Sequence, residues 1–310
     1  NIFKVDPIAI ARDLHPDYLS SRYAIDRAQT QNLPLIEVQH HHAHLAACVA
    51  DNGWQQSEPV IGVIFDGTGL GTDGKIWGGE FLVGDYGGYY RPYHLAYYPL
   101  PGGDAAVRQP KRLAAAYLRQ AGILWDESLP PLQAMDEPEQ SVLLAQLEKG
   151  INTPFTSSMG RLFDAVASLI GLRHTIHYEA QAAIELENCA GSSDSGDYTF
   201  DIRDELIDPA PLLAALAKDV KNQVPVDVLA ARFHRSVAGM VLQVCRLLRT
   251  QTGTSTVALS GGVWQNILLL RQTGTMLEEA GFEVLTHHQT PPNDGCIALG
   301  QAMIANQQLK

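Results

Sequence analysis

The sequence lacks long apolar runs and lacks an excess of positive charge. No stretch of about 18 apolar residues occurs in the 310 residues, so we expect no transmembrane helix and no membrane partner. The 22 Lys and Arg residues face 34 Asp and Glu residues, which gives a net charge of −12. Because phosphate contacts need clustered basic residues, this balance argues against a nucleic-acid partner. No secretory signal pattern is visible either.

Cysteine is scarce as well. The four cysteines, Cys48, Cys189, Cys245 and Cys296, lie far apart and include no CxxC pair. This spacing excludes a zinc-finger type of cluster. We expect buried free thiols in a reducing compartment, of which the cytoplasm is the simplest.

The length indicates more than one structural unit. The composition is ordinary for a globular protein, with 45% hydrophobic and 18% charged residues, and 310 residues exceed what one compact core usually holds. We expect two parts, residues 1–56 and residues 57–310. The first residue is Asn1 rather than Met, and the sequence opens in mid-pattern, so we expect a fragment of a longer chain.

The segment from Ile36 to Cys48, IEVQHHHAHLAAC, has four histidines within five residues. Ile36 and Val38 alternate as in a strand, and Leu-Ala-Ala continues as a helix, so the histidines are expected at a strand–helix junction. On that helix His40 and His44 share one face, with about 6 Å between their Cβ atoms. One metal ion can take a nitrogen from each, and imidazole suits Zn and Fe.

His41 and His42 project in other directions and are candidate catalytic groups, which would face a substrate or support the ligands. The alternative for the whole segment is a solvated polar start of a helix without a ligand. The isolated histidines are expected to be structural; they are His94, His174, His177 and His234.

Strand and helix patterns alternate along the chain. Strand 6–12, helix 17–30, strand 34–39 and the histidine helix imply parallel strand pairing. Residues 126–140, rich in Pro and acidic residues, are expected at the surface. The later elements are a meander of strands at 60–71, 76–84 and 89–95, helices to about 122 and at 157–171, 179–187, 209–220 and 227–250, a strand and helix from 255, a strand at 282–285 and a final helix.

Asp66 ends a buried strand and opens a glycine-rich hairpin, Asp66-Gly67-Thr68-Gly69. Consecutive backbone N–H groups in such loops cradle phosphate. Glycine-rich hairpins are also often no more than turns. The aspartate at the strand end, together with the histidine pair, makes this hairpin a candidate site.

Three later segments carry candidate binding groups. Asp164 lies beside the apolar stripe of helix 157–171, and it is either an exposed helix charge or a carboxylate for a diol such as ribose. Gly261 and Gly262 turn a strand into a helix, where backbone N–H groups can approach an anion or a nucleotide. Asp294 opens the final helix and is either a simple N-cap or a ligand.

Seven motifs occur together and in order: DLHPDYLSS (13–21), VQHHHAHLAAC (38–48), FDGTGLGTDGKIWGGE (65–80), LPGGDAA (100–106), GRLFDAVASLIG (160–171), ALSGGVWQN (258–266) and PPNDG (291–295). This set closely resembles the C-terminal carbamoyltransferase (Kae1-like) domain of the hydrogenase maturation factor HypF family, over essentially the whole chain. It is more distantly similar to antibiotic O-carbamoyltransferases and tRNA threonylcarbamoyl-transfer enzymes. The resemblance implies an α/β fold of the two-lobed ASKHA (actin, Hsp70 and sugar kinase) type. The first lobe would be incomplete here, and the nucleotide and metal site would lie at the lobe interface.

Carried over residue by residue, the resemblance implies one mononuclear divalent metal, Fe or Zn. Its ligands would be His40, His44, Asp66 and Asp294. ATP or carbamoyl-adenylate, with Mg, would bind nearby. The implied nucleotide- or substrate-binding residues are Gly67, Thr68, Gly69, Asp164, Gly261, Gly262 and Asn266.

The resemblance also implies a reaction and its partners. A carbamoyl group would pass from carbamoyl-adenylate to the C-terminal cysteine of a HypE-like protein, on the route to the cyanide ligands of nickel–iron hydrogenase. A YrdC-like domain of the full-length chain would make the carbamoyl-adenylate. The alternatives are a small-molecule O-carbamoyltransferase and a non-catalytic nucleotide-binding docking module. Turnover of carbamoyl-adenylate separates enzyme from docking module, and the identity of the acceptor separates the two enzymes.

Overall fold

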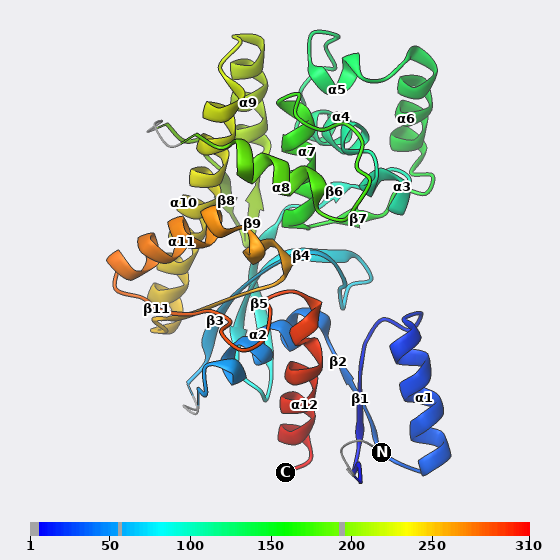
Figure 1. Cartoon of the computed structure of the whole chain (residues 1–310), viewed down its shortest axis with the longest axis vertical. Helices are drawn as coiled ribbons and strands as arrows, with labels where there is room; N and C mark the ends of the chain where they lie inside the picture. The colour runs from blue at the N-terminus through cyan, green and yellow to red at the C-terminus, as the bar shows by residue number, and fades with distance from the viewer. Residues whose placement is uncertain (1–5, 55–57, 192–195) are drawn as a thin grey trace.

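The computed structural model describes residues 6–54, 58–191 and 196–310. In these residues a nine-stranded mixed sheet carries helices on both faces, and a separate parallel sheet has two strands (Figure 1). The main path through the large sheet is β11-β10-β3-β4-β5-β9-β8. The predicted α/β class is therefore confirmed. The predicted boundary between residues 56 and 57 lies outside the described residues.

The first four elements follow the predicted order. They are β1 (Ile10–Asp13), α1 (Leu19–Gln31), β2 (Leu35–Val38) and α2 (His40–Asp51). β1 and β2 pair in parallel, in a register that sets Asp13 opposite Val38. Both strands therefore end at the same edge, where α2 begins.

The predicted meander forms the middle of the large sheet. β3 (Val60–Leu70), β4 (Ile76–Gly84) and β5 (Tyr89–Leu95) pair antiparallel in turn. On the other side of β3, β10 (Thr256–Ser260) pairs in parallel with both β3 and β11 (Glu283–Leu285). Segments about 200 residues apart in sequence thus become neighbours beside Asp66. The expectation that Asp66 ends its strand is wrong: β3 continues to Leu70, with a shift in its pairing with β4 between Phe65 and Gly69.

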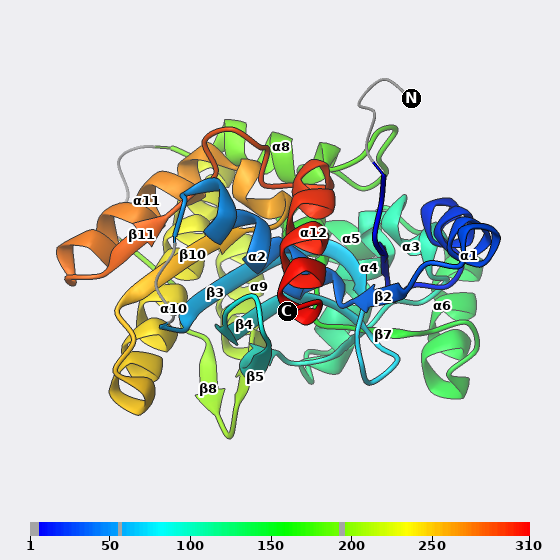
Figure 2. The same ribbon diagram turned by 90° about the horizontal axis from the view of Figure 1, so that it is seen from below.

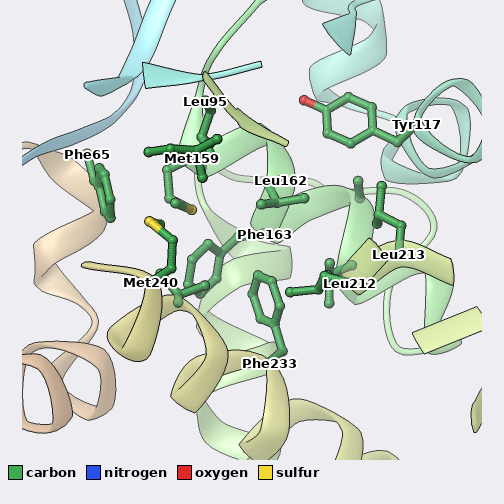
Figure 3. Packing of buried hydrophobic residues seen from close by; sticks show 14 of the residues in the cluster. Phe65, Leu95, Tyr117, Met159, Leu162, Phe163, Leu212, Leu213, Phe233 and Met240 are labelled. Carbon is green, nitrogen blue, oxygen red and sulfur yellow. The ribbon is translucent and has the colours of Figure 1, made fainter. Parts of the chain in front are cut away.

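Side chains of β3 alternate between the two faces of the sheet, as the two-residue period of a strand requires. Ile61, Val63 and Phe65 face the larger core, where α7 (Met159–Leu169) and α10 (Val226–Thr252) pack. Figure 3 shows Phe65 near Met159 and Met240, with Phe163 and Phe233 farther into this core.

The opposite face of the sheet is covered by α2. Val60 and Ile64 of β3 pack there against Leu45, which is fully buried. Burying a leucine side chain contributes about 1.5–3 kcal/mol. Gly62 leaves room for this contact, because a Cβ there would lie 2.9 Å from Leu45 Cδ1. The sheet therefore fixes the position of the helix that carries the histidines.

Helix α12 (Ile297–Gln308) packs along α2, although the two are distant in sequence (Figures 1 and 2). Ile304 and Ala305 of α12 contact the buried Ala43 and Ala46 of α2. The close approach depends on Gly300, where a Cβ would lie 1.9 Å from the carbonyl oxygen of Ala43.

We expect Gly300→Ala to lower the free energy of unfolding by about 1–3 kcal/mol, because an added methyl group in a tight contact forces the two helices apart. Urea unfolding measures the change. Gly274→Ala is the matched control: this helical glycine has nothing within 4 Å of the added methyl, and the change is expected to be neutral or stabilising. Equal stability of the two variants would contradict the prediction.

The expectation that residues 126–140 form only surface is wrong. The segment contains α5 (Pro130–Gln133) and the start of α6 (Glu137–Lys149). Leu129, Leu132 and Met135 are buried in the larger core, to which α4 (Pro110–Gln120) also contributes. Their three-residue spacing forms an apolar stripe that the surrounding prolines and acidic residues obscured.

The remaining elements complete the helical layer and the sheet edges. No helix in the described ranges combines the length and the apolar character needed to cross a membrane. All four cysteines are free, as predicted. The remaining bounds are β6 (Tyr98–Pro99), α3 (Asp104–Val107), β7 (Phe155–Thr156), α8 (Gln181–Cys189), β8 (Asp201–Arg203), β9 (Leu206–Asp208), α9 (Ala210–Lys221), η1 (Gly262–Gln265), α11 (Ile267–Glu279) and η2 (Asp294–Cys296).

Candidate functional site

The four predicted metal ligands converge. His40 and His44 come from the first two turns of α2, Asp66 from β3 and Asp294 from η2. One ligand atom from each of these residues lies within 4.8 Å of the others. The Nε2 atoms of His40 and His44 lie 3.4 and 3.6 Å from Asp66 Oδ2, and 3.5 and 3.6 Å from Asp294 Oδ1. The structure therefore brings the four predicted ligands together.

The donor set fits a divalent metal ion. Two imidazole nitrogens and two carboxylate oxygens suit Zn or Fe. Both Nε2 atoms are buried, and neither has a hydrogen-bond partner among the described residues. Such unpaired buried atoms are costly unless they bind something. A metal ion among these four atoms would satisfy both.

The charges of the cluster are also compatible with a bound divalent cation. Burial alone would lower the pKa of both histidines, but the carboxylates beside them raise it: Asp13, Asp294 and Asp66 raise the pKa of His40 well above 6.5, and Asp294 and Asp66 raise that of His44 to about 10. Burial would raise the pKa of Asp66, yet the two histidines hold it well below its usual range. The carboxylates around the two imidazoles favour positive charge between them. Imidazole protons or one divalent cation can supply it.

Further contacts orient the ligands from behind. Asp13 Oδ2 accepts a hydrogen bond from His40 Nδ1 (2.7 Å), which leaves Nε2 facing the cluster. His44 Nδ1 lies 3.3 Å from Ser260 Oγ. The Gly262 N–H donates to Asp66 Oδ1 (3.1 Å), which leaves Oδ2 for the cluster. Carboxylate support of a ligating histidine is a common feature of metal sites.

Asp13 was not among the predicted site residues. Its carboxylate reaches His40 only because β1 and β2 pair in parallel and end together. A signal was present, since Asp13 opens one of the seven motifs, just after a predicted strand.

The candidate catalytic histidines differ in their surroundings. His41 is fully buried; its Nδ1 contacts the Gln39 side-chain amide (3.1 Å), and its Nε2 is unpaired among the described residues. Burial and the neighbouring His40 lower the pKa of His41, so the ring is neutral. His42 points away from the cluster. Its Nε2 donates a hydrogen bond to the Asp85 carbonyl oxygen (2.7 Å), and its ring packs against Tyr89. The structure does not bring His42 to the cluster.

A cavity of about 600 Å³ adjoins the cluster, and Asp66 and Asp294 line it. Of the predicted binding residues, five line this cavity: Gly67, Thr68, Asp164, Gly262 and Asn266. Among the described lining residues one side chain is cationic, Arg161, against five carboxylates: Asp66, Asp164, Glu179, Glu187 and Asp294. A negatively charged ligand therefore needs Arg161 or bound cations to enter.

The two other predicted binding glycines serve close packing. A Cβ on Gly69 would lie 2.5 Å from His41 Cε1, so this glycine lets the hairpin approach the histidine helix. Gly261 has φ +106°, and a Cβ there would lie 2.2 Å from the Phe65 carbonyl oxygen. Neither glycine lines the cavity in the described structure. Both shape the site through its framework.

Asn266 lies at the wall of the cavity, but its side chain is already engaged. Its Oδ1 caps α11 by accepting from the Leu269 N–H (2.8 Å), and its Nδ2 lies 2.9 Å from His234 Nε2. His234 is buried, and burial lowers its pKa to about 4, so it is a neutral structural residue as predicted. These contacts assign Asn266 a capping role.

Asp164 is buried, so the exposed helix charge considered for it is wrong. Burial raises its pKa to about 6, although Arg161 opposes the shift. Arg161 Nη2 lies 3.1 Å from Asp164 Oδ2, but neither carboxylate oxygen has a hydrogen bond within the described part of the chain. A buried carboxylate with unused acceptor capacity, in the wall of a cavity, is a candidate ligand-binding group. Arg161 was not predicted, although it lies three residues before Asp164.

Asp294 is not the N-cap of the segment it opens. The Asn293 side chain caps η2 by accepting from the Gly295 N–H (3.1 Å). The Asp294 carboxylate is thus free to face the histidines, which hold its pKa below the usual range.

Comparisons with known proteins agree with this geometry. Residues 62–301 match the family model "Carbamoyltransferase, Kae1-like Domain, second subdomain", and residues 1–51 match "HypF Kae1-like domain". The carbamoyltransferase HypF of Rhodobacter capsulatus is 41% identical over 100% of this chain and 41% of its own length. A carbamoyltransferase HypF homolog of Cupriavidus necator is 37% identical over 97% of this chain and 78% of its own.

Two solved structures have the same fold over nearly all of the chain. A full-length HypF in its phosphate- and nucleotide-bound form has a TM-score of 0.91 and 41% identity, covering 99% of this chain and 48% of that one. The HypF of T. kodakarensis has a TM-score of 0.87 and 32% identity, covering 97% and 40%. The predicted ASKHA-type α/β fold class is confirmed. The chain spans between two fifths and one half of the length of three of these four relatives. It belongs to the HypF carbamoyltransferase family, as the Kae1-like domain.

Proposed function

We propose that this chain transfers a carbamoyl group from carbamoyl-adenylate to the C-terminal cysteine thiol of a HypE-like protein. The observation that carries the proposal is that the ligand cluster and the cavity share a wall, formed by Asp66 and Asp294. A nucleotide in the cavity can therefore present its reactive end to the cluster. The related full-length HypF structure is phosphate- and nucleotide-bound, which supports this class of ligand.

The proposed cofactor is one Fe or Zn ion, held by His40, His44, Asp66 and Asp294. When bound, it would supply Lewis-acid polarisation of a carbonyl or phosphoryl oxygen. Mg is proposed to accompany the nucleotide, because carboxylates outnumber Arg161 in the cavity wall.

The side chains of this chain would orient the nucleotide. Asp164 would accept hydrogen bonds from the ribose hydroxyls with its two oxygens, neither of which has a hydrogen bond among the described residues. Arg161 would face the phosphate, because it lies beside Gly67, one of the proposed phosphate-binding residues. Its Nη2 is 3.5 Å from the position that a Cβ on Gly67 would occupy. Holding the reacting groups in place supplies much of the rate in such bimolecular transfers. His41, whose Nε2 has no hydrogen-bond partner within the described ranges, stays a candidate catalytic group.

The transfer itself exchanges one bond for another. The thiol sulfur bonds to the carbamoyl carbon, the bond from that carbon to the phosphate oxygen breaks, AMP leaves, and the thiol proton passes to solvent. The acceptor must be a reduced thiol, so we place the reaction in the cytoplasm, as a step of hydrogenase maturation. The activating YrdC-like domain would belong to the full-length chain.

We expect the 310-residue chain to carbamoylate a HypE-type peptide ending in cysteine when carbamoyl-adenylate is supplied. Little product is expected from ATP and carbamoyl phosphate alone, because making carbamoyl-adenylate is assigned to the YrdC-like domain. Mass spectrometry of the peptide detects the added carbamoyl group.

A peptide with alanine in place of the terminal cysteine is the control. Equal modification of both peptides, or preferred transfer to small alcohols, would contradict the thiol acceptor. Binding of AMP without turnover on any acceptor would instead support a docking module.

A further inference from the structure

The loop from residue 286 to residue 293 joins β11 to η2 and carries Asp294 into the cluster. Asp294 differs from the other ligands in burial. Its side chain is 73% exposed, whereas those of His40, His44 and Asp66 are at most 10% exposed. A helix and a strand fix those three ligands. The position of Asp294 depends on how the loop is held.

The loop is held by the C-terminal end of α2. The Asp51 carboxylate, which is 9% exposed, accepts hydrogen bonds from the backbone N–H groups of His288 (2.5 Å), Gln289 (3.1 Å) and Thr290 (3.1 Å). Asn52 Nδ2 donates to the Thr286 carbonyl (2.8 Å). Consecutive N–H groups around one carboxylate form a backbone nest, which favours a negative charge.

The charge state of Asp51 supports this arrangement. Burial by itself would raise the pKa of Asp51, but the three N–H groups hold it below its usual value. The carboxylate is therefore ionised, and hydrogen bonds from backbone N–H groups to a charged acceptor are stronger than those between neutral groups.

A second connection runs from the same loop to a ligand. His287 Nδ1 lies 3.0 Å from Thr290 Oγ1, and His287 Nε2 lies 2.8 Å from Ser260 Oγ. Ser260 Oγ in turn contacts His44 Nδ1. The loop is thus joined to α2 at both ends of the helix.

We propose that Asp51 is a positioning residue that holds loop 286–293 and thereby sets Asp294 in the ligand cluster. One helix would then supply two ligands near its N-terminal end and place a third from its C-terminal end. The inference rests on the metal site proposed above. It concerns the placement of one ligand and is separate from the carbamoyl chemistry.

The test is a double-mutant cycle on Co²⁺ binding to the whole chain. Asp51→Ala is expected to weaken Co²⁺ affinity by about 10–100-fold, the usual effect of losing support behind a metal ligand. In the Asp294→Ala background the same change is expected to have almost no further effect, because the ligand that it positions is gone. An equal loss in both backgrounds would overturn the proposal.

Further variants separate the possible outcomes. Asp51→Asn keeps one acceptor oxygen, so we expect an intermediate loss of affinity and faster amide hydrogen exchange in residues 288–290 of the metal-free chain. Unchanged exchange and affinity would overturn the proposal even if Asp51→Ala does not fold. Asp208→Asn is the matched control, because this carboxylate also accepts a backbone hydrogen bond, from the Ala210 N–H, and is not part of the cluster. Equal Co²⁺ binding by wild type and Asp294→Ala would show that Asp294 is not a ligand, and it would overturn the proposal without excluding a metal on His40, His44 and Asp66.

Discussion

The double variant His40→Ala, His44→Ala is expected to lose metal binding altogether. Removing both imidazoles leaves two carboxylates, one of them 73% exposed, which cannot hold Fe or Zn against a competing chelator. We expect about one equivalent of metal per chain in the wild type and none in the variant, a loss in affinity of more than about 100-fold. Elemental analysis after purification measures the content directly.

His42→Gln is the matched control for this experiment. It replaces a histidine of the same helix whose ring contacts Tyr89 and the Asp85 carbonyl rather than the cluster. The glutamine amide can still donate a hydrogen bond, so the control is expected to retain its metal. Full metal content in the double variant, or equal loss in the control, would show that the ion is held elsewhere.

Asp164→Asn is expected to affect stability and ligand binding in opposite directions. Burial raises the folded-state pKa of Asp164 to about 6, above the ordinary 3.8, so the folded state holds this proton more tightly than the unfolded state. The free energy of unfolding of the wild type should therefore fall as the pH rises from about 4 through about 6. The asparagine variant cannot titrate, so this fall should disappear. Its relative gain at neutral pH is about 1–3 kcal/mol.

Urea unfolding of both proteins between pH 4 and pH 8 measures this difference in slope. Calorimetry with AMP measures the second effect, a weakening at pH 8 of about 1–3 kcal/mol, because the charged acceptor for the ribose is lost. The weakening should shrink below pH 6, where Asp164 of the wild type is itself protonated. Identical pH slopes would contradict the buried-charge account, and unchanged AMP affinity would remove Asp164 from the ribose site.

Local spacing was enough to predict the histidine pair. His40 and His44 lie on one face of a helix wherever that helix packs, and the strand before them was visible as an alternation. Asp66 and Asp294 were predictable because each lies beside glycines, Asp66 where the pairing of β3 with β4 shifts and Asp294 at the start of a helical turn. The convergence of all four depended on the motifs occurring together rather than on any single spacing.

Other parts of the site depend on tertiary contacts that spacing does not reveal. Asp13 supports His40 through the register of two parallel strands. Asp164 is buried because its helix packs into the cavity wall, which its spacing along the helix does not reveal. Arg161 is its ion-pair partner there. Gly69 and Gly261 were assigned to ligand binding from their motifs, but close packing against His41 and Phe65 explains them. His42, in the same motif as the ligands, turns away from them.

The joining of α2 to the loop of Asp294 also has a consequence for biosynthesis. The contact between His44 and Cys296 spans 252 residues, which a ribosome takes roughly 10–50 s to polymerise. During that interval a nascent chain contains the histidine pair and Asp66, but it still lacks Asp294, Gly300 and the loop whose N–H groups bind Asp51. Three of the proposed ligands would give a weaker and more open metal site than four. Selective loading with the correct metal is therefore expected after translation of α12, when the helix can pack along α2.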